Sequence, residues 1–293
     1  MEKKPSTDFA MEYRLREMNP DLHARFTNAV FAMQHILSNY KLIFPNYTDH
    51  TELHSLTVID FCNRLIGEQI DRMNADELYV LLMGCYFHDT GMGISMRDYE
   101  EFSRQIDFGD YFDTHDKEDI QAIIRDFHNE YAGCFIRKYA DFFEVPSEVH
   151  LFSIVQVSRG HRKTKLADEH EYPPKLVTPQ GTTICLPYLS ALIRLADEID
   201  VTSARNPVGM FDFDSLTDIT ALMEHKKHNA IKELRITEDE FIVVADTADE
   251  ELIKAIQSMI KKMQQTLDQC REAVLEHTDY VITQKKVSFQ NLS

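Results

Sequence analysis

The chain has 293 residues, enough for one large domain or for one domain with a small appendage. Its 9 glycines and 9 prolines argue against a loop-rich β protein or a glycine-rich nucleotide-binding fold, whereas long stretches dense in Leu, Ile, Met, Glu and Lys predict helices. The formal net charge of −18 at pH 7 argues against a nucleic-acid polymer or an anionic membrane as the main partner. A small phosphorylated molecule needs only one local basic patch.

The first predicted elements follow a polar start. Residues 1–20 are polar, and we expect a loosely held arm. From 22 to 44, apolar residues recur at three- and four-residue spacing, which is typical of an amphipathic helix. A turn follows, with Thr48 or Asp49 as the N-cap of a helix that runs to Ile66.

The central part of the chain predicts four more helices. Asn74 can cap a helix over 75–89, ADELYVLLMGCYFHD, whose almost continuous apolar run indicates a buried position. Further helices are expected over 116–143, 147–161 and 186–200. The loop before the last of these carries KLVTPQGTTICL, which predicts a short hairpin.

The pattern changes after Arg205. The segments AIKELRIT and EFIVVAD alternate as strands do, a long helix follows over 250–277, and YVITQKKVSF supplies a candidate third strand. The apolar stripe of the long helix is expected to pack in the core or in a homo-oligomer. We therefore predict a mainly α protein with a polar arm (1–20), a helical domain (21–205) and a small α+β appendage (206–293).

Two features bear on the cellular compartment. The five cysteines are scattered, with no CxxC pair, which predicts reduced, buried thiols. The amino terminus has no apolar signal-peptide core, and no run elsewhere approaches membrane-spanning length. We expect a cytoplasmic protein.

The candidate metal-ligating residues centre on His88-Asp89, at the end of the predicted buried helix. A carboxylate in apolar surroundings needs a partner, and a metal ion is a natural one. A His-Asp pair alone is a weak signal, and a single helical histidine is more often a hydrogen-bonded core residue. The stronger signal is a constellation of His and Asp on separate predicted helices, in the order His54, His88-Asp89, His128, His161 and Asp197.

This order resembles the HD superfamily of metal-dependent phosphohydrolases, whose pattern is H…HD…H…H…D. The flanking segments HTELHSLTV, LLMGCYFHDTGM and ALIRLADEID support the resemblance, which covers roughly residues 45–205. It implies an HD-type helical bundle and a dinuclear metal centre. His54, His88, Asp89 and Asp197 would hold the first metal, and Asp89, the central catalytic carboxylate, would bridge to a second metal completed by His128 and His161.

Imidazole and carboxylate ligands suit two divalent transition metals, drawn from Mn, Fe, Ni, Co or Zn. Such a pair lowers the pKa of a shared water and neutralises phosphate charge, so no protein nucleophile is required. The expected activity is hydrolysis of a phosphoester or phosphodiester, with a nucleotide or another small phosphorylated molecule as substrate. The alternatives are an HD-fold di-iron oxygenase and a nucleotide-binding sensor or effector without turnover.

Candidate substrate contacts come from the segment RGHRKTK around His161. Its Arg159, Arg162, Lys163 and Lys165 form the strongest basic cluster, and arginine can contact phosphate in a bidentate manner. The alternative is that the lysines are solvated surface residues and do not contact substrate. The loop 164–186 could be a lid over the site or a dimer contact.

Three further residues are candidates by their spacing. Arg194 and Asp200 lie three residues before and after Asp197 on one helix face, so Arg194 could bind substrate and Asp200 could orient a ligand imidazole. An ordinary helix ion pair between the two is an equal alternative. His50, four residues before His54, could touch substrate or be a solvated residue at a helix start.

Overall fold

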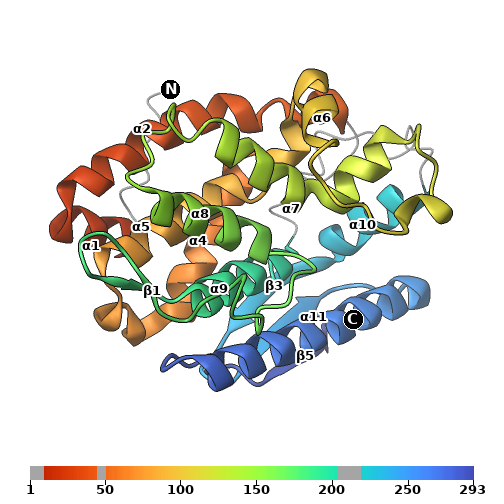
Figure 1. The fold of residues 1–293 in the computed structure, drawn as a ribbon. Coiled ribbons are helices and arrows are strands. Elements are labelled where there is room, and N and C mark those ends of the chain that lie inside the picture. The colour runs from red at the N-terminus through yellow and green to blue at the C-terminus, as the bar shows by residue number, and fades with distance from the viewer. Residues whose placement is uncertain (1–9, 45–50, 203–218) are drawn as a thin grey trace.

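The computed structural model describes residues 10–44, 51–202 and 219–293, and these ranges form a mainly α protein with a small sheet near the C-terminus (Figure 1). The predicted fold class is confirmed. The proposed caps Thr48 and Asp49, the candidate residue His50 and the predicted domain boundary after Arg205 lie outside the described residues. The three-part division of the chain therefore stays a prediction.

The N-terminal part departs from the expectation of a loose arm. Residues 10–18 form a helix, α1, in which Met11 and Leu15 are completely buried. The side chain of Asn19 then caps α2 by accepting a hydrogen bond from the Leu22 amide. Met11 and Leu15 are four residues apart on one helix face, so even a mostly polar segment can pack when its few apolar residues align. These helices are α1 (Ala10–Met18), α2 (Pro20–Leu37) and α3 (Tyr40–Ile43).

The buried helix α5 is the centre of the bundle. Its capping box, between Asn74 and Glu77, matches the predicted start, and nearly all its residues are buried between α2, α4, α8 and α9. The helices of this bundle are α4 (Glu52–Ile66), α5 (Ala75–Phe87), α6 (Met96–Phe102), α7 (Ile120–Lys138), α8 (Glu148–Gly160) and α9 (Leu186–Glu198), with short 3-10 turns η1 (Gly67–Arg72), η2 (Thr90–Gly93) and η3 (Tyr111–Asp113).

The strand predictions are confirmed. The hairpin pairs β1 (Leu176–Val177) with β2 (Thr183–Ile184). In the C-terminal sheet, β3 (Ile231–Ile236) is antiparallel to β4 (Glu240–Ala245), and β5 (Lys286–Asn291) is parallel to β4. The third strand begins at Lys286, later than the pattern indicated.

The long helix α11 (Glu250–His277) lies along α9 and joins the C-terminal segment to the bundle (Figure 1). Its apolar stripe, including Ile256, Met263 and Leu267, is buried within the chain, so this stripe belongs to the core. The remaining helix of this part is α10 (Ile219–Ala230). Across the described ranges, no helix is long and apolar enough to cross a membrane.

Candidate metal centre

His88 and Asp89 lie directly after the last turn of α5 and are buried in the middle of the bundle. The turn η2 that follows packs against α7 so closely that a Cβ on Gly91 would lie 2.0 Å from the carbonyl oxygen of His128. Only glycine fits there, and this contact brings His128 beside Asp89. A similar close approach occurs where α8 crosses α9, because a Cβ on Gly160 would lie 2.6 Å from Ser190 Cβ.

The four predicted histidine ligands share one orientation. Each ring places its Nδ1 within hydrogen-bonding distance of an oxygen that can only accept, so each Nδ1 carries the proton and each Nε2 presents a lone pair. The Nδ1 contacts run from His54 to Asp200 Oδ2 (2.7 Å), from His88 to the Cys85 carbonyl (2.9 Å), from His128 to the Arg125 carbonyl (2.7 Å) and from His161 to the Ser158 carbonyl (2.5 Å).

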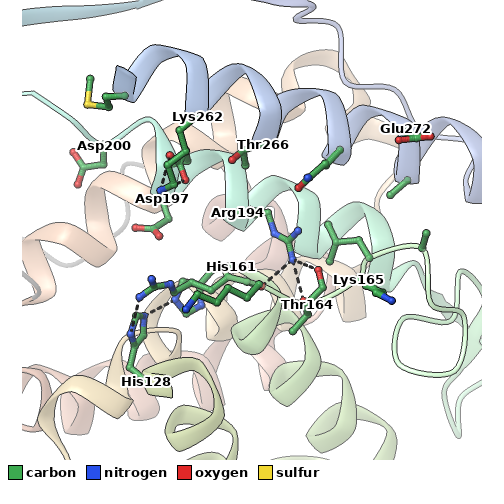
Figure 2. Close-up of a pocket in the computed structure, with 18 of the residues that line it drawn as sticks. His128, His161, Thr164, Lys165, Arg194, Asp197, Asp200, Lys262, Thr266 and Glu272 are labelled. Atoms are coloured by element: carbon green, nitrogen blue, oxygen red, sulfur yellow. Dashed lines mark hydrogen bonds and ion pairs between the residues drawn. The ribbon is translucent and has the colours of Figure 1, made fainter. Parts of the chain in front are cut away.

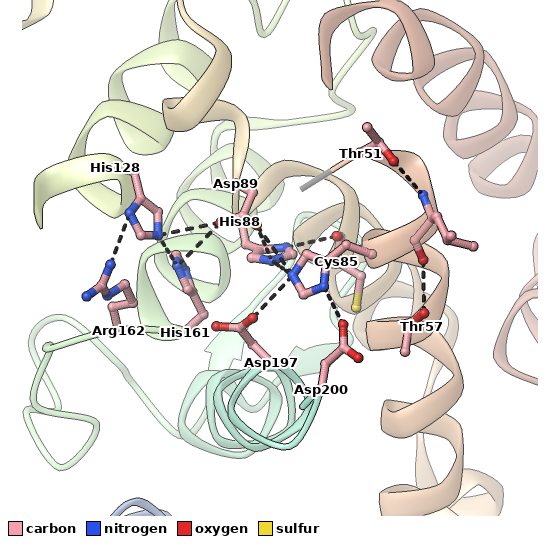
Figure 3. A network of polar contacts seen from close by, with 12 residues as sticks. Thr51, Thr57, Cys85, His88, Asp89, His128, His161, Arg162, Asp197 and Asp200 are labelled. Carbon is pink, nitrogen blue, oxygen red and sulfur yellow. Dashed lines mark hydrogen bonds and ion pairs between the residues drawn. The ribbon is translucent and has the colours of Figure 1, made fainter. Parts of the chain in front are cut away.

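The Nε2 atoms converge in two pairs (Figure 3). The Nε2 atoms of His54 and His88 are 3.1 Å apart, and those of His128 and His161 are 2.8 Å apart. Because the Nδ1 atoms already carry the protons, neither pair has a proton to share. Two lone pairs at these distances repel each other unless a cation lies against both. The donor set therefore fits a metal ion at each pair.

Asp89 lies between the two pairs. Its Oδ2 is 3.4 Å from His54 Nε2 and 3.3 Å from His88 Nε2, whereas its Oδ1 is 3.5 Å from His128 Nε2 and 4.0 Å from His161 Nε2. Two groups that could hold a metal ion result, and they have Asp89 in common. This arrangement is the one expected of a bridging carboxylate.

Asp197, on α9, supplements the first group. Its Oδ1 lies 3.2 Å from His54 Nε2. Burial alone would raise the pKa of this carboxyl, but the neighbouring His54, His88 and His161 hold its pKa well below the usual value. The structure thus brings together all six predicted ligands.

Burial sets the protonation state of the second pair. Desolvation, with the nearby Arg162 and His161, lowers the pKa of His128 well below its ordinary value. Desolvation, with the nearby His88, lowers the pKa of His161 to about 4. Both rings are therefore neutral near neutral pH, the form that binds a metal ion.

Of the two roles predicted for Asp200, the structure shows the one in which it orients a histidine. Its Oδ2 accepts the Nδ1–H of His54, which fixes the tautomer and the orientation of that ring. The alternative, an ion pair with Arg194, does not form: the Arg194 guanidinium donates instead to the carbonyls of Gly160, Arg162 and Thr164 and to Thr164 Oγ1.

A cavity of about 900 Å³ opens onto the centre (Figure 2). Asp89, His128, His161 and Asp197 line its inner end. The first residues of the loop 164–186 also line it, whereas the hairpin of that loop packs on α5.

The candidate phosphate contacts differ in their positions. Arg162, Lys163 and Arg194 line the cavity, but Arg159 does not. Arg159 forms a two-pronged ion pair with Glu130 and also donates to Gln156. Arg162 donates to the Arg125 carbonyl, the same oxygen that accepts from His128. Its Nη1 also lies 3.2 Å from His128 Nδ1, a longer contact than the 2.7 Å that joins this Nδ1 to the carbonyl.

Sequence reasoning missed several residues near the cavity. His228 is buried, lines the cavity and lies with Nδ1 2.9 Å from the Val201 carbonyl. One face of α11 forms the opposite wall. Its Lys262 forms an ion pair of 3.1 Å with Glu198, the neighbour of Asp197. No local signal in the sequence indicated that α11 would cover the site.

Comparisons with known proteins give one result. The family model described as HD-CE matches residues 44–270, which include every described metal-ligand candidate and most of α11. No curated protein and no solved structure matches the chain. The match covers well over half of the sequence, so the chain belongs to the HD-CE family.

Proposed function

We propose that this protein is a metal-dependent phosphoric ester hydrolase that acts on a nucleotide or another small phosphorylated molecule. The observation that carries the proposal is the position of Asp89, whose two oxygens face separate histidine pairs. A carboxylate between two nitrogen-lined sites is suited to holding two cations close together, as in-line attack on phosphorus requires.

Each residue has a definite task in this proposal. His54, His88, Asp89 and Asp197 would hold one metal ion, and Asp89, His128 and His161 would hold the other. When bound, the two ions would supply an activated water and neutralise charge on the phosphoryl group. The chain itself orients the imidazoles through their Nδ1 contacts.

The cavity supports a phosphorylated ligand. Arg162, Lys163 and Lys165 line it, with Arg162 and Lys163 directly after His161 in the chain, and these cations favour an anionic group. Arg194 serves these residues indirectly, because its four hydrogen bonds hold the segment from Gly160 to Thr164 in place. We assign Arg194 a positioning role and Arg162 and Lys163 a role in binding phosphate.

A screen of phosphoesters tests the proposal. The purified protein, loaded in turn with Mn, Fe, Co, Ni, Zn or Mg, is incubated with nucleoside phosphates, cyclic nucleotides and general phosphoesters. We expect release of phosphate or of a phosphomonoester with at least one transition metal, and loss of this activity in His88→Ala. Dioxygen consumption by an iron-loaded protein without phosphate chemistry would favour the oxygenase, and tight nucleotide binding without turnover would favour the sensor.

A further inference from the structure

The wall of the cavity opposite the metal ligands is one face of α11. Lys262, Thr266, Gln269, Ala273 and Glu276 follow one another at alternating spacings of four and three residues, so they form a single stripe along the helix. The stripe faces the cavity while a neighbouring stripe of the same helix is buried in the core. Residues of the C-terminal segment therefore line the same cavity as four of the metal-ligand candidates.

The charge along this wall changes sign. Lys262 lies beside Asp197, at the metal end, where it pairs with Glu198 (Figure 2). Glu272 lies ten residues further along the same helix, about 15 Å away at 1.5 Å per residue, and it also lines the cavity. Glu276, one turn beyond, adds a second carboxylate.

Gln269 and Glu272 have no polar partner among the residues that the structure describes. No hydrogen bond or ion pair within the described ranges involves either side chain head, although most of the other charged groups around the cavity are paired. Both residues are exposed on the cavity wall, so their heads are available to a ligand. A carboxylate can only accept hydrogen bonds, so the ligand group that it binds must donate them.

The two ends of the cavity thus call for different chemistry. The metal end, with Arg162 and Lys163 nearby, suits an anionic phosphate. The Glu272 end disfavours a ligand that is anionic along its whole length, such as a polyphosphate or an oligonucleotide, because of like-charge repulsion. It favours a neutral or cationic group with N–H donors.

We propose that Gln269 and Glu272 select the substrate by binding the end remote from its phosphate, and that this end carries amino or imino N–H groups, as an amino-substituted nucleobase does. This inference rests on the proposed function for the position of the phosphate. In this proposal the C-terminal segment recognises the substrate, and the residues of the helical bundle carry out the hydrolysis.

The test uses pairs of 5′-phosphates that differ by one amino group, guanosine against inosine and adenosine against purine riboside. Dissociation constants are measured by calorimetry with the Mn²⁺-loaded protein, together with kcat/KM where hydrolysis occurs. In at least one pair we expect the amino-bearing member to bind roughly tenfold tighter or more, the effect of one hydrogen bond to a charged group.

Two variants complete the test. Glu272→Gln is expected to remove most of this preference, mainly through KM, without loss of bound metal. Asp268→Asn alters a carboxylate of the same helix that does not line the cavity and should keep the preference. Equal binding within both pairs, binding of neither member, or an unchanged preference in Glu272→Gln would overturn the inference. Preferential binding without hydrolysis would instead contradict the proposed function and leave the inference standing.

Discussion

Two buried clusters of histidine and aspartate in the described part of the chain, one around His150 and one around Asp89, differ in where their protons lie. In the cluster around His150, every polar atom has a partner that can complete a hydrogen bond. His150 Nδ1 lies 2.8 Å from Ser147 Oγ, its Nε2 lies 2.8 Å from Asp76 Oδ1, and Thr182 donates to the other oxygen of Asp76. In the cluster around Asp89, four Nε2 lone pairs and two carboxylates face one another.

The difference shows that burial of His and Asp does not by itself indicate a metal. The His150 cluster is complete as it stands, because its hydroxyls and its imidazole can distribute their protons among the acceptors. The Asp89 cluster is complete only with added positive charge, since its Nδ1 atoms have already donated to oxygens outside it. The direction of the Nδ1 contacts, more than the residue types, distinguishes a cluster that could hold metal ions from a structural network.

The largest contrast should come from matched carboxylate substitutions in the two clusters. Asp89→Asn removes the shared carboxylate, and we expect phosphate release to fall by at least about a hundredfold, beyond the range for residues that only orient a ligand. Asp76→Asn should instead lower the free energy of unfolding by about 1–3 kcal/mol and leave the activity of the folded protein unchanged. Steady-state kinetics and urea unfolding of both variants measure these effects. Equal loss of activity in Asp89→Asn and Asp76→Asn would contradict the distinction between a functional and a structural cluster.

A smaller effect is expected at Asp200, which orients His54 without lying among the Nε2 atoms. Asp200→Asn keeps the size of the side chain but weakens the acceptor for the Nδ1–H of His54. We expect metal affinity to fall by about 10- to 100-fold. Titration with a competing chelator measures this affinity. An unchanged affinity would show that the tautomer of His54 is set by something else.

The two clusters should also differ in their dependence on pH. Desolvation, with the nearby His88, lowers the pKa of His161 from the ordinary 6.5 to about 4, so between these values the unfolded chain binds a proton that the folded chain does not. The stability of the metal-free protein should therefore fall as the pH drops through this window. The hydrogen bond from His150 lowers the pKa of Asp76 from its usual 3.8, and the stability that this pair contributes is lost only below that value.

Urea unfolding of the metal-free protein at about pH 7, pH 5 and pH 3 separates the two windows. The variant His161→Asn should lose less stability between the first two pH values than the wild type does. A wild-type protein that is as stable at about pH 5 as at about pH 7 would contradict the assignment of neutral, buried imidazoles to the centre.

The smallest effect concerns Arg162, at the edge of the metal cluster. Arg162→Ala removes a cation from the cavity wall, and we expect KM for the phosphorylated substrate to rise up to about tenfold while metal content stays within error. Arg159→Ala is the control, because Arg159 pairs with Glu130 away from the cavity. Its loss should lower stability and leave KM unchanged. The opposite result would move the phosphate contact to Arg159.

Many helices, strands and candidate metal ligands could be predicted from the sequence because their patterns involve residues close together in the chain. The N-cap at Asn74, the apolar run of α5 and the alternation of β3 and β4 depend on neighbouring residues, and all appear as expected. The metal ligands could be named because their order along the chain resembles a known pattern. Their Nδ1 acceptors are mostly carbonyls three residues earlier, a consequence of local backbone geometry.

Other features depend on contacts between distant parts of the chain. No local pattern marks His150 as buried, because its partner Asp76 lies 74 residues away. Arg159 was expected to bind phosphate, but its guanidinium forms an ion pair with Glu130 on another helix. The placement of α11 over the cavity follows from tertiary packing against α9, which no periodicity reveals. These are the points at which one sequence could not replace the structure.

The most direct test of the account is the metal content of the purified protein. Elemental analysis after loading with Mn, Fe, Co, Ni or Zn should find two equivalents of a transition metal per chain in the wild type and in Asp76→Asn, and a clear loss in Asp89→Asn. A wild-type protein that retains no transition metal, and whose thermal stability none of these ions changes, would contradict the assignment of a dinuclear centre at Asp89.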